Sequence, residues 1–183
     1  MKKHLLINLI ILFVAISTTF GQQAFKNGDA ILNLGIGIGH TNNYDYGDYK
    51  PAFAPSINAS FEYGIYEIPD AGIFSIGGYG DIYHTWYNYD GYKDKWNYSI
   101  LAVRTAFHLG FLNTSMFDFY GGLMGGVQHL KYKNDFSNET YTDNDFSLGL
   151  FAGGKIMFQS KLGVFAELGY GTSFLSVGVT YKF

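Results

Sequence analysis

The sequence predicts an all-β fold, an eight-stranded antiparallel up-and-down transmembrane β-barrel. Three observations support this. From Ala30 onward, apolar residues alternate with small or polar residues at a period of two, which is the periodicity of strands. Only 15% of the 183 residues are charged, whereas 19% are aromatic and 24 are glycine, a profile typical of closely packed strands. The connections between the alternating segments are long and short in turn, as in a membrane barrel.

The alternating segments follow one another along the chain. In the first segment, Leu34 and Ile36 alternate with Gly35 and Gly37, and the later segments repeat this pattern. An even number of strands returns the C-terminus to the side on which the barrel begins. The predicted strands are Ala30–Thr41, Ala54–Tyr66, Ile73–Tyr83, Tyr98–Leu109, Phe117–Gln128, Phe146–Phe158, Leu162–Gly171 and Phe174–Phe183.

The charged residues inside these segments separate a membrane barrel from a soluble one. All of them fall on the face that carries Gly, Ser and Asn, and none falls on the Leu, Ile, Val and Phe face. A charge that faces the bilayer midplane costs about 2–4 kcal/mol, whereas a charge in the lumen need not. The alternative, a soluble lipocalin-like barrel, would show the inverse arrangement. The residues predicted to face the lumen are Glu62, Asp81, Arg104, Asp118, Lys155, Glu167 and Lys182.

The connections fix the expected orientation. If the chain enters the barrel from the periplasmic side, every long connection lies outside the cell and every short one lies in the periplasm. The long connections are Thr41–Phe53, His84–Asn97 and His129–Asp145, and we expect all three to be loops.

The N-terminus reads as a secretory signal peptide. Lys2 and Lys3 precede an apolar run, and small residues lead to a cleavage site before Gln22. The alternative is a membrane anchor, but Asn8 interrupts the run, which is shorter than the ~20 residues of a spanning helix. We therefore expect a cleaved signal at residues 1–21, a short periplasmic segment at 22–29 and an outer-membrane barrel at 30–183.

Composition excludes several other classes of protein. The formal net charge is −3, so a nucleic-acid-binding surface is not expected. The absence of Cys excludes a disulfide scaffold, a Cys-ligated zinc site and an iron–sulfur cluster. No cofactor is predicted.

The C-terminal stretch Val177-Gly-Val-Thr-Tyr-Lys-Phe183 places apolar residues at alternate positions and ends on Phe. With this ending, the chain from about Ala30 to its C-terminus resembles the barrel domain of the small OmpA/OmpX-type outer-membrane proteins of Gram-negative bacteria. The resemblance implies outer-membrane lipids as surroundings and the barrel-assembly machinery as a partner. It also implies that the assembly signal comprises Val177, Val179, Tyr181 and Phe183.

Inside the barrel, the opposite charges predict a network. Eight strands enclose a lumen that side chains nearly fill, so a plug is favoured over a charge-lined conduit. Arg104 lies near mid-depth, and Glu167 is its closest partner in estimated height, with Glu62 or Asp81 as alternatives. The predicted network comprises Glu62, Asp81, Arg104, Lys155 and Glu167.

The long outer loops are rich in Tyr, Asp and Asn, a mixture found in recognition surfaces, although a merely solvated rim would look similar. Asp45 with Asp48, or Asp143 with Asp145, would bind Ca²⁺ only weakly, and without EF-hand spacing no metal site is predicted. The residues expected to contact an extracellular ligand of unknown identity are Tyr44, Tyr46, Tyr49, Trp86, Tyr89 and Tyr92.

Catalysis is the remaining alternative, because some outer-membrane barrels of this size resemble enzymes that act on lipid A. Such chemistry needs a nucleophile, a base and an orienting carboxylate within reach of one another. His40, His84 and His129 are expected at the outer rim and His108 near the periplasmic end, and none stands out beside a Ser and an acid. We therefore predict a monomeric, non-enzymatic protein that serves envelope structure or surface interaction. A lipid-A-modifying enzyme and a minor solute channel are the alternatives.

Overall fold

The structure is a computed structural model that describes residues 23–40, 52–89, 92–134 and 139–183. The predicted signal peptide lies outside these residues, as do Tyr44, Tyr46 and Tyr49 of the first long connection.

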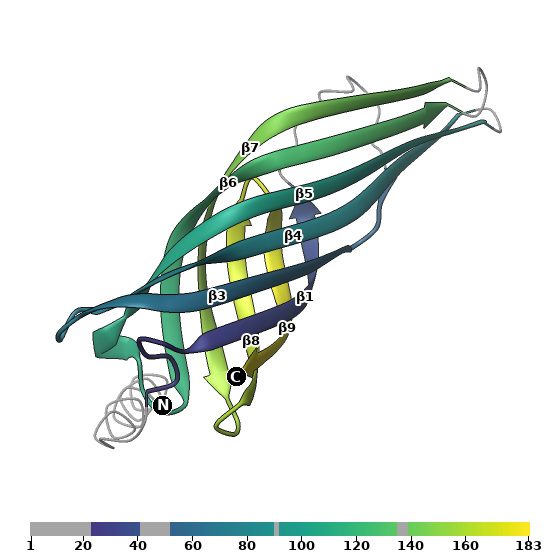
Figure 1. The fold of residues 1–183 in the computed structure, drawn as a ribbon. Coiled ribbons are helices and arrows are strands. Elements are labelled where there is room, and N and C mark those ends of the chain that lie inside the picture. The colour runs from purple at the N-terminus through teal and green to yellow at the C-terminus, as the bar shows by residue number, and fades with distance from the viewer. Residues whose placement is uncertain (1–22, 41–51, 90–91, 135–138) are drawn as a thin grey trace, which may run out of the picture.

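Within the described residues, eight long strands close into a ring in which each strand is antiparallel to both neighbours (Figure 1). The last strand pairs with the first, so the sheet closes and its backbone groups are paired around the ring, as a strand in lipid requires. The predicted fold class is confirmed. The strands are β1 (Ala30–His40), β3 (Ser56–Ile68), β4 (Gly72–Tyr89), β5 (Tyr92–Leu109), β6 (Phe117–Asn134), β7 (Thr140–Met157), β8 (Leu162–Tyr170) and β9 (Ser173–Lys182).

Two short elements complete the described chain. The two-residue strand β2 (Ala52–Phe53) pairs with β4 at Thr85 and Trp86, and the 3₁₀ turn η1 (Gly110–Leu112) lies between β5 and β6. No helix in the described ranges is long and apolar enough to span a membrane.

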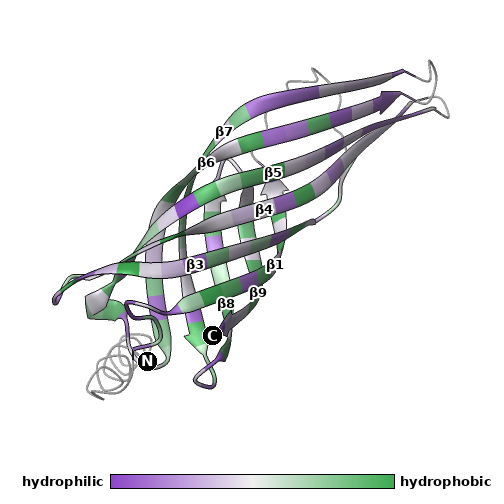
Figure 2. Ribbon diagram, viewed as in Figure 1, coloured by the Kyte–Doolittle hydropathy of each residue, from purple (hydrophilic) through white to green (hydrophobic). Residues whose placement is uncertain are grey.

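The two faces of the wall differ as the alternation predicts. Outward side chains are apolar and exposed, with Leu101 76%, Phe146 73% and Val103 62% exposed. Inward side chains are polar yet buried: Arg104 and Lys155 are each 1% exposed. Figure 2 shows apolar residues along the strands of the ring. This assignment of the inner and outer faces is confirmed, and the outward set forms an apolar belt around the barrel.

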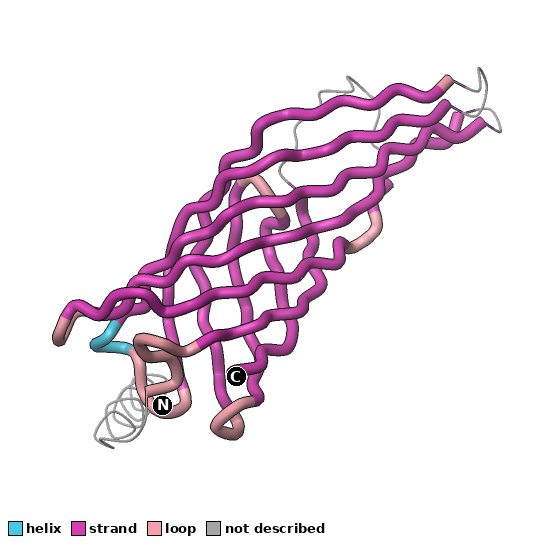
Figure 3. Tube along the Cα trace, viewed as in Figure 1, coloured by secondary structure: helices cyan, strands magenta, loops and turns pink. Residues whose placement is uncertain are grey.

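The structure corrects the prediction of long loops. His84–Asn97 and His129–Asp145 are largely strand, because β4 pairs with β5 as far as Tyr89 and Tyr92, and β6 pairs with β7 as far as Lys133 and Thr140. The strands β4, β5, β6 and β7 are each 18 residues long, whereas β8 has 9 and β9 has 10. Figure 3 shows strand continuing almost to the tips of these hairpins. The prediction failed because both faces are polar there, so hydropathy does not alternate.

The barrel therefore has two unlike ends. One end carries the turns β3–β4, β5–β6 and β7–β8 together with the C-terminus, and we call it the short-turn end. At the other end, β4 to β7 extend well beyond β1, β8 and β9, as Figure 1 shows. We call residues 84–89, 92–97, 129–134 and 140–145 of these strands the protruding sheet.

Close approach of the strands depends on inward glycines. A Cβ at Gly77 of β4 would collide with the carbonyl oxygen of Phe61 on β3. The absence of a side chain at this position lets the two strands pair tightly around a narrow lumen.

Candidate functional site

The lumen near the short-turn end holds a cluster of buried charged groups centred on Arg104 of β5. One guanidinium nitrogen lies 2.8 Å from Glu167 Oε2 on β8 and 3.2 Å from Glu62 Oε1 on β3. A second nitrogen lies 3.4 Å from the other oxygen of Glu167, and the guanidinium carbon lies 3.7 Å from the ring centre of Phe151. Arg104 thus joins two carboxylates whose strands, β3 and β8, lie on either side of β5 in the ring.

Lys155 and His108 extend this cluster. Lys155 Nζ lies 3.5 Å from Asp118 and 3.8 Å from Glu62, and 3.8 Å from the ring centre of Tyr120. His108 Nδ1 lies 2.9 Å from Asp118, and its Nε2 lies 3.1 Å from Glu62. Each ring nitrogen of His108 therefore lies within hydrogen-bonding distance of a carboxylate. We call Glu62, Arg104, His108, Asp118, Lys155 and Glu167 the lumen charge network.

In this network, three carboxylates surround Arg104, Lys155 and the ring of His108. Tyr120 contributes a further hydrogen bond, since its hydroxyl donates to Glu167 Oε2 at 3.1 Å. Every charged member is at most 7% exposed. Taking charges out of water is costly, and mutual pairing with additional hydrogen bonds offsets that cost.

Asp81 is predicted from the sequence to join the network around Arg104, but in the structure it contacts a different set of residues. Its Oδ2 lies 3.5 Å from His40 Nε2, 3.3 Å from the Tyr79 hydroxyl and 3.4 Å from Ser173 Oγ. His40 in turn stacks on Tyr83, with 3.7 Å between the ring centres. These contacts lie toward the hairpin end, where β1 finishes, rather than beside Arg104.

Sequence reasoning missed the part that His108 takes in the network and did not find Ser75. His108 Nε2 lies 3.2 Å from Ser75 Oγ, so Ser75, His108 and Asp118 follow the order of a hydrolytic triad. The environment does not suit that chemistry. Glu62 contacts the same ring nitrogen and also accepts the hydrogen bond of the Ser75 hydroxyl, so the serine proton is directed at a carboxylate and not at the ring. Ser75 and His108 are also fully buried, so an ester bond cannot reach them.

Residues 23–29 cross the short-turn end, and we call them the N-terminal strap. Ala24 N–H donates to Thr114 O at 2.6 Å, and Asn113 Nδ2 donates to Phe25 O at 2.6 Å. Lys182 on the last strand lies 3.3 Å from Asp29. Phe25 is fully buried and stacks on His108, with 4.0 Å between the ring centres. The strap thus covers the network on this side.

Gly64 of β3 accommodates the strap. The backbone N–H of Gly28 donates to Gly64 O at 2.9 Å, and Gly64 N–H donates to Asp29 O at 3.0 Å. A Cβ at Gly64 would lie 2.7 Å from the carbonyl oxygen of Lys26, which is closer than real contacts allow. The strap can therefore lie flat on this strand only because position 64 has no side chain.

Three of the residues predicted to contact an extracellular ligand lie within the described part of the chain, and all three belong to the protruding sheet: Trp86, Tyr89 and Tyr92. Trp86 lies on β4 directly across from Lys95, and the Lys93 ammonium lies 5.2 Å from its ring centre. Tyr89 and Tyr92 pair with each other at the hairpin tip. On the inner face, Trp96 and Tyr132 lie 5.2 Å apart between ring centres (Tyr83 and Tyr98 stack deeper in the lumen).

Tyr132 is held by polar contacts. Burial, together with the nearby charge of Asp94, raises the pKa of Tyr132 above its ordinary value. Its protonated hydroxyl donates to Asp94 Oδ1 at 3.2 Å and accepts from Asn134 Nδ2 at 3.1 Å.

The predicted assembly-signal residues Val177, Val179, Tyr181 and Phe183 face outward and are 40–64% exposed. The first three lie on β9 and Phe183 follows it directly, beside the seam at which β9 closes the ring against β1. Whether an assembly factor reads them stays a prediction.

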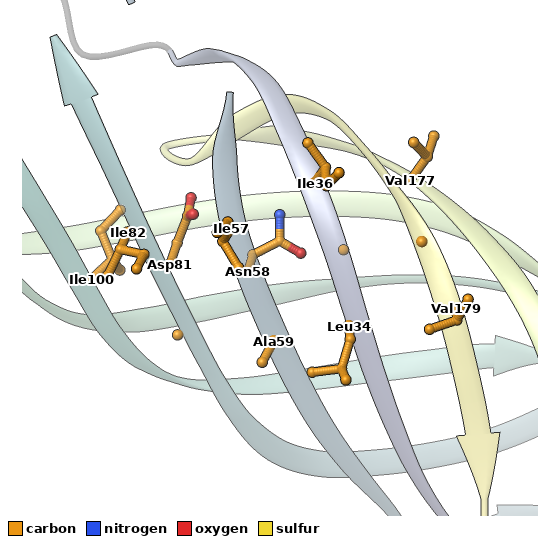
Figure 4. A pocket seen from close by; sticks show the side chains of 13 residues that line it. Leu34, Ile36, Ile57, Asn58, Ala59, Asp81, Ile82, Ile100, Val177 and Val179 are labelled. Carbon is orange, nitrogen blue, oxygen red and sulfur yellow. The ribbon is translucent and has the colours of Figure 1, made fainter. Parts of the chain in front are cut away.

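An open depression of about 660 Å³ indents the wall over β1, β3, β4 and β9. Figure 4 shows its lining, in which Leu34, Ile36, Val177 and Val179 belong to the outward apolar set. It lies where outward Ala59 pairs with Gly80, so two small residues sit among larger ones. This lining is mostly apolar, and it resembles the rest of the belt.

The fold and the lumen define the class of protein, a small eight-stranded transmembrane barrel with a buried internal charge network. No family model matches the sequence, and no curated protein matches it. Among solved structures, the chain is similar to Ail, the attachment invasion locus protein of Yersinia pestis, at 16% identity and a TM-score of 0.46, over 86% of this chain and 100% of that one. It is similar to the N-terminal β-barrel domain of Pseudomonas aeruginosa OprF at 14% identity and a TM-score of 0.47, over 88% and 100%. It is also similar to a de novo designed transmembrane β-barrel at 13% identity and a TM-score of 0.47, over 87% and 98%.

Proposed function

We propose that the protein is a non-enzymatic outer-membrane barrel whose plugged lumen anchors a protruding sheet that binds an extracellular partner. One observation carries this proposal: four adjacent strands of 18 residues each stand beside four shorter strands. A membrane crossing needs about 9–11 residues, so about 7–9 residues of each long strand lie beyond the bilayer.

The edge of the protruding sheet supports a binding role. β7 pairs with β6 along its whole length, but it pairs with β8 only from Leu150 onward. Among the described residues, Thr140–Gly149 is therefore hydrogen-bonded to a strand on one side only. An exposed strand edge offers backbone donors and acceptors to an extended segment of another protein. The edge carries Asp143, Asn144 and Asp145, which would favour a basic or polar segment.

The lumen charge network supports a plug. Its charged groups come from β3, β5, β6, β7 and β8, so they tie the wall together across the interior. Opening a conduit here would separate opposite charges that are buried against one another. This disfavours a minor solute channel.

The test compares the whole protein with a variant that has shortened hairpins. Residues 84–97 and 129–144 are each replaced by Asn-Gly, which joins the directly paired Tyr83 to Tyr98 and Gln128 to Asp145 through two-residue turns. Both proteins, in nanodiscs, are screened against extracellular proteins and glycans. Ligands that bind the whole protein and not the variant support the proposal.

Three other results would overturn parts of it. Equal binding by both proteins would remove the protruding sheet from the function. Steady conductance in planar bilayers would establish a channel, and an altered lipid A mass in cells that express the protein would establish an enzyme.

A further inference from the structure

Four lysines gather on one face of the protruding sheet. Lys93 and Lys95 lie on β5, and Lys131 and Lys133 lie on the neighbouring strand β6. Lys95 pairs directly with Lys133. The four side chains together make this face of the two strands basic.

The outward direction of this face follows from the alternation along both strands. On β5, Val103 and Leu101 face outward. Counted from them toward the N-terminus, every second residue is Ser99, Asn97, Lys95 and Lys93 in turn. On β6, the same rule leads from outward Val127 through His129 to Lys131 and Lys133. The four lysines therefore continue the lipid-facing surface of the barrel and do not face its lumen.

Contacts between side chains agree with this direction. His84 Nδ1 lies 2.7 Å from Asn97 Oδ1, and His129 Nδ1 lies 2.8 Å from Asn144 Oδ1, which makes a polar row above the apolar belt. Beyond that row, the Lys93 ammonium lies over the ring of Trp86.

The two faces of the protruding sheet carry opposite charge. Its inner face holds Asp94, Asp143 and Asp145, and Asp94 accepts its hydrogen bond from inward Tyr132. Among the described residues of the four strand extensions, the outward face holds the four lysines and two histidines and no Asp or Glu. Glu139 precedes β7, level with Asn134 and Asp94, and so lies at the same height as these lysines.

The height of Lys131 matches the headgroup region of a bilayer. Lys131 follows Val127, an exposed residue of the apolar belt, by four positions, which is about 13 Å along the strand and less along the bilayer normal because strands tilt. Lysine side chains reach several ångströms further and place their ammonium groups at the interface. Lys133, Lys95 and Lys93 extend the row outward.

We propose that Lys93, Lys95, Lys131 and Lys133 form a docking surface for the phosphate groups of lipid headgroups in the leaflet at the hairpin end. The occupant is lipid because the patch is continuous with the lipid-facing belt on the same strands. Bound phosphate would hold the protruding sheet at a fixed height. This inference does not depend on whether the sheet also binds an extracellular partner.

The test measures lipid selectivity of the whole protein in phosphatidylcholine vesicles. Electron spin resonance of spin-labelled phosphatidic acid and spin-labelled phosphatidylcholine gives their relative association with the barrel. A lysine near an anionic surface is worth about fivefold in association at low salt. The double variant Lys131→Gln with Lys133→Gln should therefore lower the preference for phosphatidic acid by about fivefold or more. Added salt should lower the preference of the unmodified protein.

The matched control is Lys26→Gln with Lys161→Gln. Both residues are exposed at the short-turn end, and the pair removes the same net charge. It should leave the preference for phosphatidic acid within about twofold of that of the unmodified protein, because these positions lie outside the patch. Equal losses in the two double variants would overturn the proposal, because the effect would then follow net charge alone.

A soluble anion distinguishes the other source of phosphate. Inositol hexakisphosphate is titrated onto the protein in phosphatidylcholine nanodiscs. If it binds through Lys131 and Lys133 while the lipid preference is unchanged by their substitution, the patch serves a soluble polyanion and the proposal fails. Where the double variant does not fold, Lys131→Gln alone replaces it and should still lower the lipid preference.

Discussion

The two ends of strand β5 show how one alternating pattern serves two environments. Near the short-turn end, β5 places Arg104 and His108 inside the barrel, where both are at most 1% exposed and are fixed by carboxylates from other strands. Near the hairpin end, the same strand places Asp94 inward and Lys95 outward, and both are much more accessible. The alternation is unchanged, but water has replaced lipid on one side and packed side chains on the other.

This difference predicts where stability resides. Charges in the lumen cannot be removed singly without leaving a buried partner uncompensated. A charge in the protruding sheet can be removed singly at little cost, because solvent screens its interactions. Substitutions at the two ends should therefore differ in effect by several kcal/mol, even when they lie on the same strand.

The largest effect is expected for Arg104→Ala. It leaves Glu62 and Glu167 buried without the guanidinium that joins them, and should lower the free energy of unfolding by about 3–5 kcal/mol. Urea titration in detergent micelles measures the loss. Asp94→Asn, at the hairpin end of the same strand, is the control and should cost less than about 1 kcal/mol. Similar losses for the two variants would contradict the comparison.

The ion pair between Arg104 and Glu167 is tested by a double-mutant cycle that combines Arg104→Ala with Glu167→Ala. Since Arg104 and Glu167 are in direct contact, the double variant should lose less than the sum of the single losses, with a coupling of about 0.5–3 kcal/mol. Additive losses would show that the two side chains do not stabilise each other.

Phe25→Ala removes the aromatic ring of the strap that stacks on His108. Replacing a buried Phe by Ala typically costs about 3 kcal/mol or more, and the cavity here would adjoin the lumen charge network. Unfolding measurements report the loss. Leu112→Ala, near the same end of the barrel but 38% exposed, serves as the control. If Phe25→Ala costs no more than Leu112→Ala, the strap does not contribute to the closed barrel.

The lipid-facing wall gives the next effect. Leu150→Arg places a charge on the belt, where Leu150 is 55% exposed, and should cost about 2–4 kcal/mol if it lies near the midplane. Ser147→Arg, three residues earlier on the inner face, should cost less. Reversible folding into vesicles measures both. Equal costs would mean that the inner and outer faces of β7 have been confused.

These effects also explain what the sequence could and could not predict. Lipid tolerates few charges, so the inward position of Arg104, Lys155 and Glu167 could be read from the alternation alone. Outside the bilayer that constraint is absent. Lys93-Asp-Lys-Trp-Asn97 is polar on both faces, so it looked like a loop although it is strand.

Contacts across the lumen were harder to predict than the faces of the strands. Estimated height along the strands matches Arg104 with Glu167, but the second contact of Arg104 with Glu62 depends on the stagger of the strands, which the sequence does not specify. For the same reason, the sequence alone predicts Asp81 in a network to which it does not belong. Phe25 precedes the first strand, and no periodic pattern indicates that it folds back onto His108.

The smallest effect is expected at the hairpin tips. Replacing residues 87–94 by Asn-Gly removes the end of the β4–β5 hairpin and keeps Trp86 paired with Lys95. A two-stranded hairpin is marginally stable in water by itself, so the barrel keeps this end folded. The hairpin end therefore contributes little to the stability of the barrel. The free energy of unfolding should fall by less than about 1 kcal/mol, measured by the same urea titration as for Arg104→Ala. A loss as large as that of Arg104→Ala would show that the protruding sheet stabilises the barrel, and the contrast between the two ends of β5 would no longer hold.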